Sequence, residues 1–148
     1  MKLKQISISI ENSPGRLYEV THALGKEGIN LRALNLVDTG LRGQLRLLVS
    51  DVATARRILM QMHVPAEINE VVAVEIEDKP GALASLLKQL LDGGINVAYM
   101  YAYVSTQPGS AVMVFKFSDD DKAIAVLQRH GNKLLDSEAF GMIESSTA

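Results

Sequence analysis

The second half of this chain repeats the first half. Residues 8–34 align without a gap on residues 74–100, and nine of these 27 aligned positions are identical. Average composition would give roughly two identities. The identical pairs are mostly core residues and the prolines and glycines that direct a backbone: Ile10/Ile76, Glu11/Glu77, Pro14/Pro80, Gly15/Gly81, Leu17/Leu83, Leu24/Leu90, Gly28/Gly94, Ile29/Ile95 and Asn30/Asn96. The repeat predicts two copies of one structural unit.

The two copies differ in length by a short insertion. Ser50-Asp51 match Ser118-Asp119 only at an offset of 68 residues, whereas the earlier positions match at an offset of 66. The two extra residues fall where Thr106-Gln107-Pro108-Gly109 predicts a hairpin loop. We place the first domain at residues 1–70 and the second at residues 71–148, with almost no linker between them.

Each copy opens with the pattern of a strand followed by a helix. In the first copy, Ile6, Ile8 and Ile10 alternate with polar residues, which is typical of a strand with one face in water. Pro14 fits the first turn of the following helix, because its φ angle is preset and its missing N–H would have no partner there. Apolar residues then recur at helical spacing until Gly28, which predicts a C-terminal cap.

The remaining patterns complete a β-α-β-β-α-β order in both copies. In the first copy we expect strands at residues 29–37, 44–49 and 67–69, and a helix capped by Asp51 that buries Ala55, Ile58, Leu59 and Met62. In the second copy we expect strands at residues 72–76, 95–104, 111–117 and 133–136, a helix with the stripe Leu83, Leu86, Leu87, Leu90 and Leu91, and a helix at residues 121–130 after Asp119. The predicted fold is α+β, with two tandem ferredoxin-like domains that each pack two helices on one face of an antiparallel sheet.

The composition disfavours several classes of function. The chain has no cysteine, which removes disulfides, thiolate metal sites and cysteine nucleophiles. Its three histidines lie in separate segments, so we expect no metal and no cofactor. A formal net charge of −2 without a basic stripe disfavours binding to nucleic acid. The chain has neither a signal peptide nor an apolar run long enough for a bilayer, so we expect a cytoplasmic protein with no membrane partner.

The repeated motif resembles the ACT domain family. The resemblance rests on a strand, then Asn/Asp-x-Pro-Gly-x-Leu, then a helix, then Gly-Ile-Asn and a second strand. The first copy carries it as Asn12-Ser13-Pro14-Gly15-Arg16-Leu17 with Gly28-Ile29-Asn30, and the second as Asp78-Lys79-Pro80-Gly81-Ala82-Leu83 with Gly94-Ile95-Asn96. It covers essentially the whole chain. No catalytic domain is attached, so the chain is similar to a free-standing tandem ACT domain protein.

This resemblance implies that the protein senses a free amino acid or a similar small metabolite. In serine-binding members, the ligand lies between the loop after the first strand of one domain and the start of the second strand of a neighbouring domain. Carried over by position, the ligand-binding residues are Asn12, Pro14, Gly15 and Asn30 in the first copy and Asp78, Pro80, Gly81 and Asn96 in the second. Those members also use a histidine where this chain has Ile10 and Ile76.

The chemistry of these residues suits an α-amino acid. The open N–H groups at a helix start, together with the helix dipole, favour a carboxylate. Gly15 and Gly81 lack a Cβ and would allow a ligand to approach the backbone. An asparagine can accept from the ammonium and donate to the carboxylate, whereas an ionised Asp78 can only accept. We therefore expect the two sites to differ.

Each of these features also has a purely structural interpretation. Pro-Gly at a strand–helix junction often only marks the place where the helix starts. Asn30 and Asn96 could bond their local backbone between helix and strand. The acidic run at residues 118–121 could suggest a cation, but a helix cap followed by acidic residues in the first turn explains it better.

Three tyrosines distinguish the second copy from the first. Tyr99, Tyr101 and Tyr103 alternate along one predicted strand and therefore share a face of the sheet. Such a face is too apolar to be left in water. We expect it to pack against the other domain or against a second chain, with direct ligand contact as the alternative.

The same order of elements occurs in proteins of several functions, so only the particular residues can distinguish between those functions. The third strands lack the stacking aromatics of an RNA-recognition domain, and a ferredoxin would need cysteines. An acylphosphatase-like arginine is present as Arg16, but Ala82 replaces it in the second copy. No nucleophile–base pair can be assembled, so we expect no enzyme activity.

Two functions remain open. We expect a homodimeric regulatory protein that binds an amino acid and acts on an enzyme or a transcription factor. The alternative is a protein-interaction module or regulatory subunit whose ligand binding is weak or lost.

Overall fold

The computed structural model describes residues 1–11, 13–104 and 107–144, which form two compact units. The N-terminal unit contains Lys4–Asn69 and the described part of the tail from Ser137 onward. The C-terminal unit contains Met1–Leu3 and Glu70–Asp136. The division into domains at residues 1–70 and 71–148 stays a prediction. No helix among the described residues is long and apolar enough to cross a membrane.

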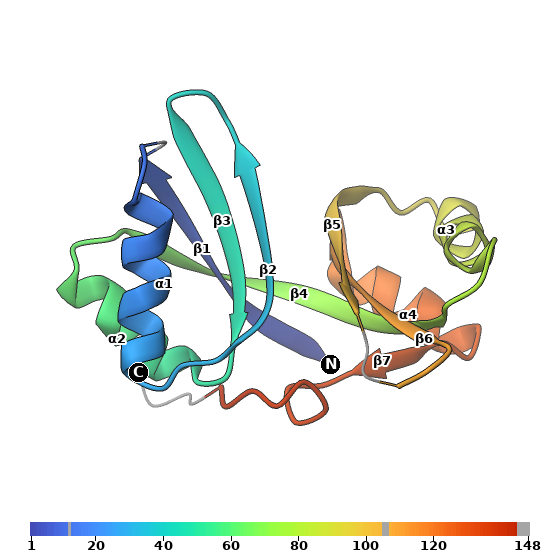
Figure 1. Ribbon diagram of the computed structural model, residues 1–148. Coiled ribbons are helices and arrows are strands. Elements are labelled where there is room, and N and C mark those ends of the chain that lie inside the picture. Colours follow the sequence, from blue (N-terminus) through green and yellow to red (C-terminus); the bar gives the residue numbers. More distant parts are fainter. Residues whose placement is uncertain (12, 105–106, 145–148) are drawn as a thin grey trace. The chain divides into compact units, whose positions relative to one another are not determined.

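The N-terminal unit packs two helices against an antiparallel sheet (Figure 1). Its elements are β1 (Lys2–Glu11), α1 (Arg16–Lys26), β2 (Leu31–Asp38), β3 (Arg42–Val49), α2 (Val52–Gln61) and the first residues of β4 (Ala66–Glu77). The strand order is β2-β3-β1-β4, and β3 pairs antiparallel with both β1 and β2. The sheet residues Ile6, Ile8 and Leu47 and the helix residues Leu24 and Leu59 are buried.

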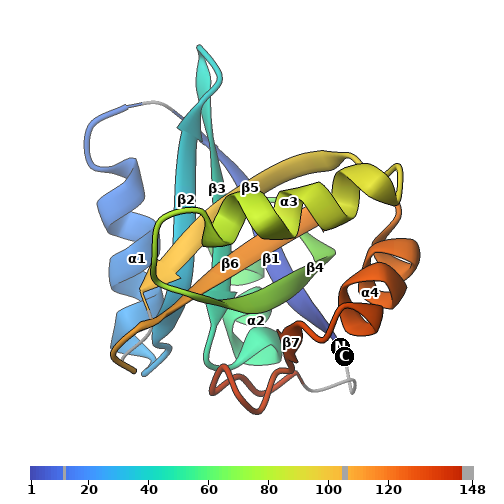
Figure 2. The same cartoon turned by 90° about the vertical axis from the view of Figure 1, so that its right-hand side faces the viewer.

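The C-terminal unit repeats this arrangement. Its elements after β4 are α3 (Ala82–Asp92), β5 (Val97–Val104), β6 (Ser110–Phe117), α4 (Asp120–Arg129) and β7 (Lys133–Leu135). The strand order is β7-β4-β6-β5, and every pair is antiparallel. Figure 2 looks onto α3 and α4. Val74 and Phe115 pack with Leu86, Leu90 and Leu127 from these two helices in one apolar core.

The element order of both copies is the one that the sequence predicts, and the differences are local. The strands expected at residues 67–69 and 72–76 are one continuous strand, β4, because no turn residue interrupts the alternation between them. Leu91 lies outside the buried stripe of α3 and is 70% exposed. The hairpin loop prediction includes Thr106, which lies outside the described residues. Gln107-Pro108-Gly109 does form a turn, in which Ser110 N donates to Gln107 O.

The predicted caps are present. Asp51 accepts a hydrogen bond from Thr54 N at 3.1 Å, and Asp119 accepts one from Lys122 N at 3.0 Å. The acidic run after β6 therefore begins a helix, as the capping interpretation predicts. Gly28 has a positive φ and follows the end of α1, where Ile29 N donates back to the main chain. Such a left-handed glycine cap satisfies carbonyls that the helix leaves open.

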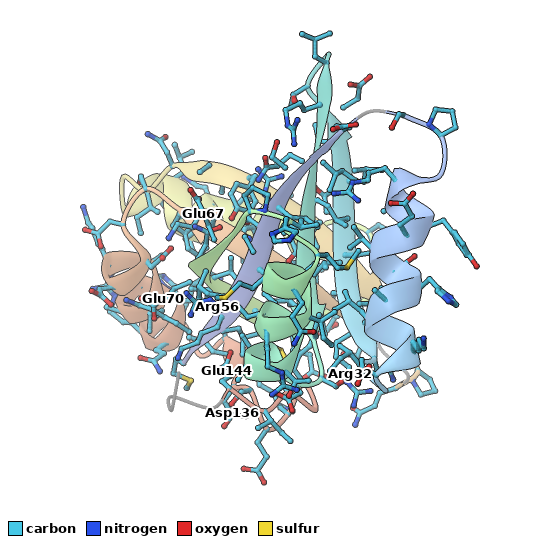
Figure 3. All side chains as sticks on the ribbon, turned by 90° about the vertical axis from the view of Figure 1, so that its left-hand side faces the viewer. Arg32, Arg56, Glu67, Glu70, Asp136 and Glu144 are labelled. Atoms are coloured by element: carbon cyan, nitrogen blue, oxygen red, sulfur yellow. The ribbon has the colours of Figure 1, made fainter. Side chains whose placement is uncertain are left out.

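The tail after Ser137 belongs to the N-terminal unit, which the repeat pattern did not predict. Ile143 exchanges backbone hydrogen bonds with the β3–α2 junction, donating to Ser50 O at 2.7 Å and accepting from Val52 N at 3.0 Å. Arg32 Nε donates to Gly141 O at 3.1 Å, and Glu144 accepts a bond from Lys4 N. Figure 3 labels Arg32 and Glu144. Phe140 and Met142 are buried, so this tail contributes to the core of the N-terminal unit.

Candidate functional site

A Pro-Gly turn joins the first strand to the first helix in each unit. Arg16 N donates to Ser13 O at 3.3 Å across Pro14 and Gly15, and Gly15 has φ 88° and ψ −15°. These are the values of the third residue of a type II β-turn, which requires a positive φ and favours proline just before it. Helix α1 therefore begins at Arg16, and the prediction that Pro14 lies in its first turn is wrong.

The C-terminal unit builds the same turn. Ala82 N donates to Lys79 O at 3.2 Å, and Gly81 has φ 85° and ψ −9°. An added Cβ would meet nothing within 4 Å at either Gly15 or Gly81. The described residues therefore require glycine at these positions for its backbone conformation, because an L side chain rarely adopts such a φ.

The turn leaves the helix that follows it without a side-chain cap. Gly15 and Gly81 occupy the N-cap positions of α1 and α3, and neither glycine has a side chain that could cap its helix. The second helix of each unit, in contrast, has an aspartate cap. An uncapped helix start keeps several N–H groups open and carries the positive end of the helix dipole. Both Pro-Gly turns thus present a site that favours an anion.

The two Gly-Ile-Asn asparagines are anchored through their main chain. Asn30 N donates to Ser50 Oγ at 2.8 Å, and Ser50 N donates to Asn30 O at 2.8 Å. Asn96 and Ser118 make the same pair of bonds, at 3.2 and 2.9 Å. Both asparagines are exposed. This arrangement holds the start of each second strand against the end of the third and leaves the asparagine side chain at the surface.

Neither unit brings its own predicted ligand residues together. The Pro-Gly turn precedes α1 and Asn30 follows it, so the 11-residue helix separates them by about 16 Å (Figure 1). Helix α3 separates Pro80 and Gly81 from Asn96 in the same way (Figure 2). One small ligand can therefore contact both motifs only if they come from different units or different copies of the chain.

Two further motif positions precede the Pro-Gly turns. Asn12 lies outside the described residues. Asp78 is exposed, and its main-chain N donates to Gly109 O at 2.9 Å. That bond ties the start of the second Pro-Gly turn to the β5–β6 hairpin and leaves the Asp78 side chain at the surface.

The sequence reasoning missed a hollow of about 480 Å³ in the C-terminal unit. Its walls come from the end of β4, one face of α3, the start of β6 and the turn between α4 and β7, and its polar lining includes Glu75, Lys79, Gln89, Ser110 and Lys133. The first copy has serine in place of Glu75, and this departure between the copies is one signal of the hollow in the sequence.

The Glu75 carboxylate in this hollow is fixed by a hydrogen bond and an ion pair. Its side chain is 20% exposed, accepts a hydrogen bond from Ser110 Oγ at 2.7 Å and pairs with Lys133 Nζ at 2.9 Å. The Ser110 hydroxyl, followed by the Lys133 ammonium, lowers the pKa of the Glu75 carboxyl below its ordinary value. Glu75 is therefore an anion fixed at the wall of the hollow.

The three tyrosines lie on one strand face as predicted. Tyr99, Tyr101 and Tyr103 are paired across β5 and β6 with Lys116, Val114 and Val112. Tyr101 is buried and the other two are half-buried. Which partner or ligand this face serves stays a prediction. Among the described residues, no group of three histidine or acidic side chains is arranged to hold a metal ion.

Comparison with known proteins identifies the family. The family model described as "ACT domain pair" matches residues 1–141, and the chain therefore belongs to the ACT domain family. The crystal structure of protein BT0572 from Bacteroides thetaiotaomicron is 38% identical to it, with a TM-score of 0.90 over 97% of this chain and 98% of that one. No curated protein matches the sequence.

More distant structures share the fold. The regulatory subunit of aspartate kinase from Thermus thermophilus is 20% identical, with a TM-score of 0.61 over 84% of this chain and 87% of that chain. The corresponding subunit from Thermus flavus is 18% identical, with a TM-score of 0.57 over 84% and 88% of the two chains. These matches confirm the predicted α+β fold of tandem βαββαβ units.

The Pro-Gly turn generates a prediction with a matched control in the same segment. Gly15→Ala should reduce the free energy of unfolding by about 1–2 kcal/mol, because alanine must adopt a positive φ. Gly25→Ala, inside α1, should instead increase it by about 0.5–1 kcal/mol, since that glycine has ordinary helical geometry and open space around it. Chemical denaturation of both variants measures the difference. Equal changes in the free energy of unfolding for the two variants would contradict the positive φ at Gly15.

The Glu75 contacts generate a prediction about pH. Because its pKa is lowered on folding, Glu75 stabilises the protein above its ordinary pKa of about 4.3, and this contribution is lost as the pH falls through the lowered value. Ser110→Ala should raise the Glu75 pKa toward 4.3, as measured by NMR titration of the carboxyl carbon. The stability difference from the natural protein should shrink in acid. Ser85→Ala is the control, and an unchanged Glu75 pKa in Ser110→Ala would be the contrary result.

Proposed function

We propose that this ACT domain pair is a regulatory protein that binds a free amino acid, or a similar small metabolite, at its Pro-Gly turns. The observation that carries the proposal is the pair of uncapped helix starts. In both units the same turn exposes helix N–H groups, and the other helix of the unit closes its start with an aspartate. A carboxylate is the ligand group that such a helix start favours.

The proposed site has two sides that come from different units or copies. One side is the Pro-Gly turn with its preceding residue, Asn12 or Asp78. The ligand carboxylate faces the next amides of α1 or α3, because Arg16 N and Ala82 N already donate within the turns. The other side is Asn30 or Asn96, whose surface amide can accept from an ammonium and donate to a carboxylate. The 11-residue helix between the two motifs is the reason for this division. Asp78, which can only accept when ionised, makes the two sites unequal.

The regulatory role is supported by fold and by chemistry. The aspartate kinase regulatory subunits have the same fold, and regulation of an enzyme or a transcription factor is the role that we propose for this chain. We propose that the protein has no catalytic activity of its own. We also propose that the protein works in the cytoplasm, since a chain without cysteine suits a reducing compartment.

An interaction module is the second candidate, and a particular surface favours it. Strand β2 ends the order of strands in the N-terminal unit and carries Leu34 and Leu36, which are 50% and 48% exposed. An edge strand with exposed leucines commonly pairs with another chain. We propose that β2 contributes to a homodimer, and such a contact is compatible with ligand binding.

Ligand binding is tested first by screening the twenty protein amino acids for one that raises the melting temperature. Asn30→Ala and Asn96→Ala should then weaken the binding of that amino acid about ten- to a hundredfold, because each removes a hydrogen bond to a charged ligand group. Calorimetry measures the affinity. The melting temperature without ligand should change little, since both side chains are exposed.

Gln61→Ala is the control for this experiment, because that exposed side-chain amide at the end of α2 lies outside the Pro-Gly turns, the Gly-Ile-Asn motifs and the hollow around Glu75. If both motif variants bind the amino acid as tightly as the natural protein, the proposed site is wrong. If no amino acid raises the melting temperature, the interaction-module function is favoured.

The dimer proposal makes its own prediction. Light scattering should give the mass of two chains, and Leu36→Glu should give the mass of one, because a buried charge would oppose packing of this edge. Met60→Glu is the matched control, since Met60 is exposed on α2 and away from β2. A natural protein with the mass of one chain at tens of micromolar would contradict the proposal.

A further inference from the structure

The hollow in the C-terminal unit occurs where the two copies have diverged. The repeat aligns Glu75 with Ser9 and Ser110 with Arg42, and the strand pairing agrees, since Glu77 faces Ser110 as Glu11 faces Arg42. In the N-terminal unit, the Arg42 guanidinium binds Ser9 on the neighbouring strand β1. Its Nε donates to Ser9 Oγ at 2.7 Å, and Nη2 donates to Ser9 O at 2.9 Å.

The C-terminal unit has a small residue where the N-terminal unit has that arginine. The Ser110 hydroxyl donates to the Glu75 carboxylate, and both residues line the hollow. A further difference lies after the second helix, where Lys133 takes the place of Pro65. In the N-terminal unit, an arginine bonded to a neighbouring strand occupies this place. The C-terminal unit instead has a carboxylate, a small hydroxyl and a lysine around an open volume.

The charges of the hollow are balanced. Glu75 pairs with Lys133, and Glu77 pairs with Lys79 at 2.8 Å. Both lysine side chains are more than 60% exposed, whereas Glu75 is 20% exposed. Ion pairs with such exposed lysines are worth little, so a ligand can replace either lysine at low cost. The hollow therefore has two carboxylates and two ammonium groups, and this balance favours a ligand without net charge.

The remaining lining suits a small polar molecule. Ile76 and Leu86 provide apolar surface, and the Asn132 amide donates to Gln89 Oε1 at 2.6 Å. A volume of about 480 Å³ lies within the range of small-molecule sites, which combine apolar walls with a few fixed polar groups. The fixed carboxylate is the natural partner of a ligand cation, and the two exposed ammonium groups are partners of a ligand anion.

We propose that this hollow is a second ligand site, present only in the C-terminal unit, for a small zwitterion with an ammonium and a carboxylate. The ligand ammonium binds the Glu75 carboxylate, and the ligand carboxylate binds the ammonium groups of Lys133 and Lys79. The proposal rests on the proposed function for its class of ligand. Glu75 and Lys133 lie outside the Pro-Gly and Gly-Ile-Asn site, whereas Lys79 is the first residue of the second Pro-Gly turn.

The experiment is an NMR titration of the full chain, labelled with ¹⁵N, with each of the twenty protein amino acids. The amides of Ser110, Asn132 and Lys133 report on the hollow, and those of Leu17 and Tyr18 report on the start of α1, which has no residue in the lining of the hollow. We expect at least one amino acid to shift the first set. Glu75→Gln should weaken that binding about ten- to a hundredfold, because it removes a charged partner of the ammonium.

Ser110→Arg is the sharper variant, because it gives the C-terminal unit the arginine of the N-terminal unit. It should abolish the shifts in the hollow and leave the shifts at the start of α1 unchanged. Arg42→Ser, its reciprocal, is the control and should leave both sets unchanged. The dispersion of each spectrum and the melting temperature establish that the variants are folded, and if one of them fails to fold the other decides.

Each outcome separates this proposal from the proposed function. Shifts in the hollow that both variants remove support the proposal. Shifts confined to the start of α1 overturn it and leave the proposed function intact. Shifts confined to the hollow support it and contradict the Pro-Gly site. If no amino acid shifts either set, both are wrong.

Discussion

The rest of the structure depends on one β-turn, which occurs once in each unit. Proline sets the first central position of this turn, and glycine supplies the positive φ at the second. The turn ends the first strand and starts a helix within a few residues, but it places glycine where a capping side chain would otherwise stand. Gly15 and Gly81 thus leave two helix starts open, and the proposed function follows from that opening.

The two units share a helix-side core but differ on the other face of the sheet. In the N-terminal unit this face is polar, and Gln5 Nε2 donates to Ser7 Oγ, which donates in turn to Asn69 Oδ1. The equivalent strands of the C-terminal unit carry apolar residues and tyrosines, among them Ala73 and Tyr101. The core positions preserve the fold, and the divergence on the other face and around Glu75 makes the units chemically unequal.

The sequence predicts most of the fold because the repeat marks each element twice. The caps at Asp51 and Asp119 follow from local chemistry, and so does the order of elements. Packing of the tail after Ser137 could not be predicted, because it depends on contacts distant in sequence and has no counterpart in the repeat. The hollow around Glu75 was missed for a related reason, since its walls come from four separate segments. The Pro-Gly pair predicts the junction between strand and helix, but the proline lies in the turn and not in the helix, because its φ fits both structures.

The most direct test of the central claim is a crystal structure of the protein with the amino acid that stabilises it most. The uncapped helix starts predict the ligand carboxylate within hydrogen-bond distance of the amides that follow Arg16 N in α1 or Ala82 N in α3. They also predict the side chain of Asn30 or Asn96, from a different unit or copy, on the opposite side of the ligand. A carboxylate bound away from both helix starts would contradict the claim.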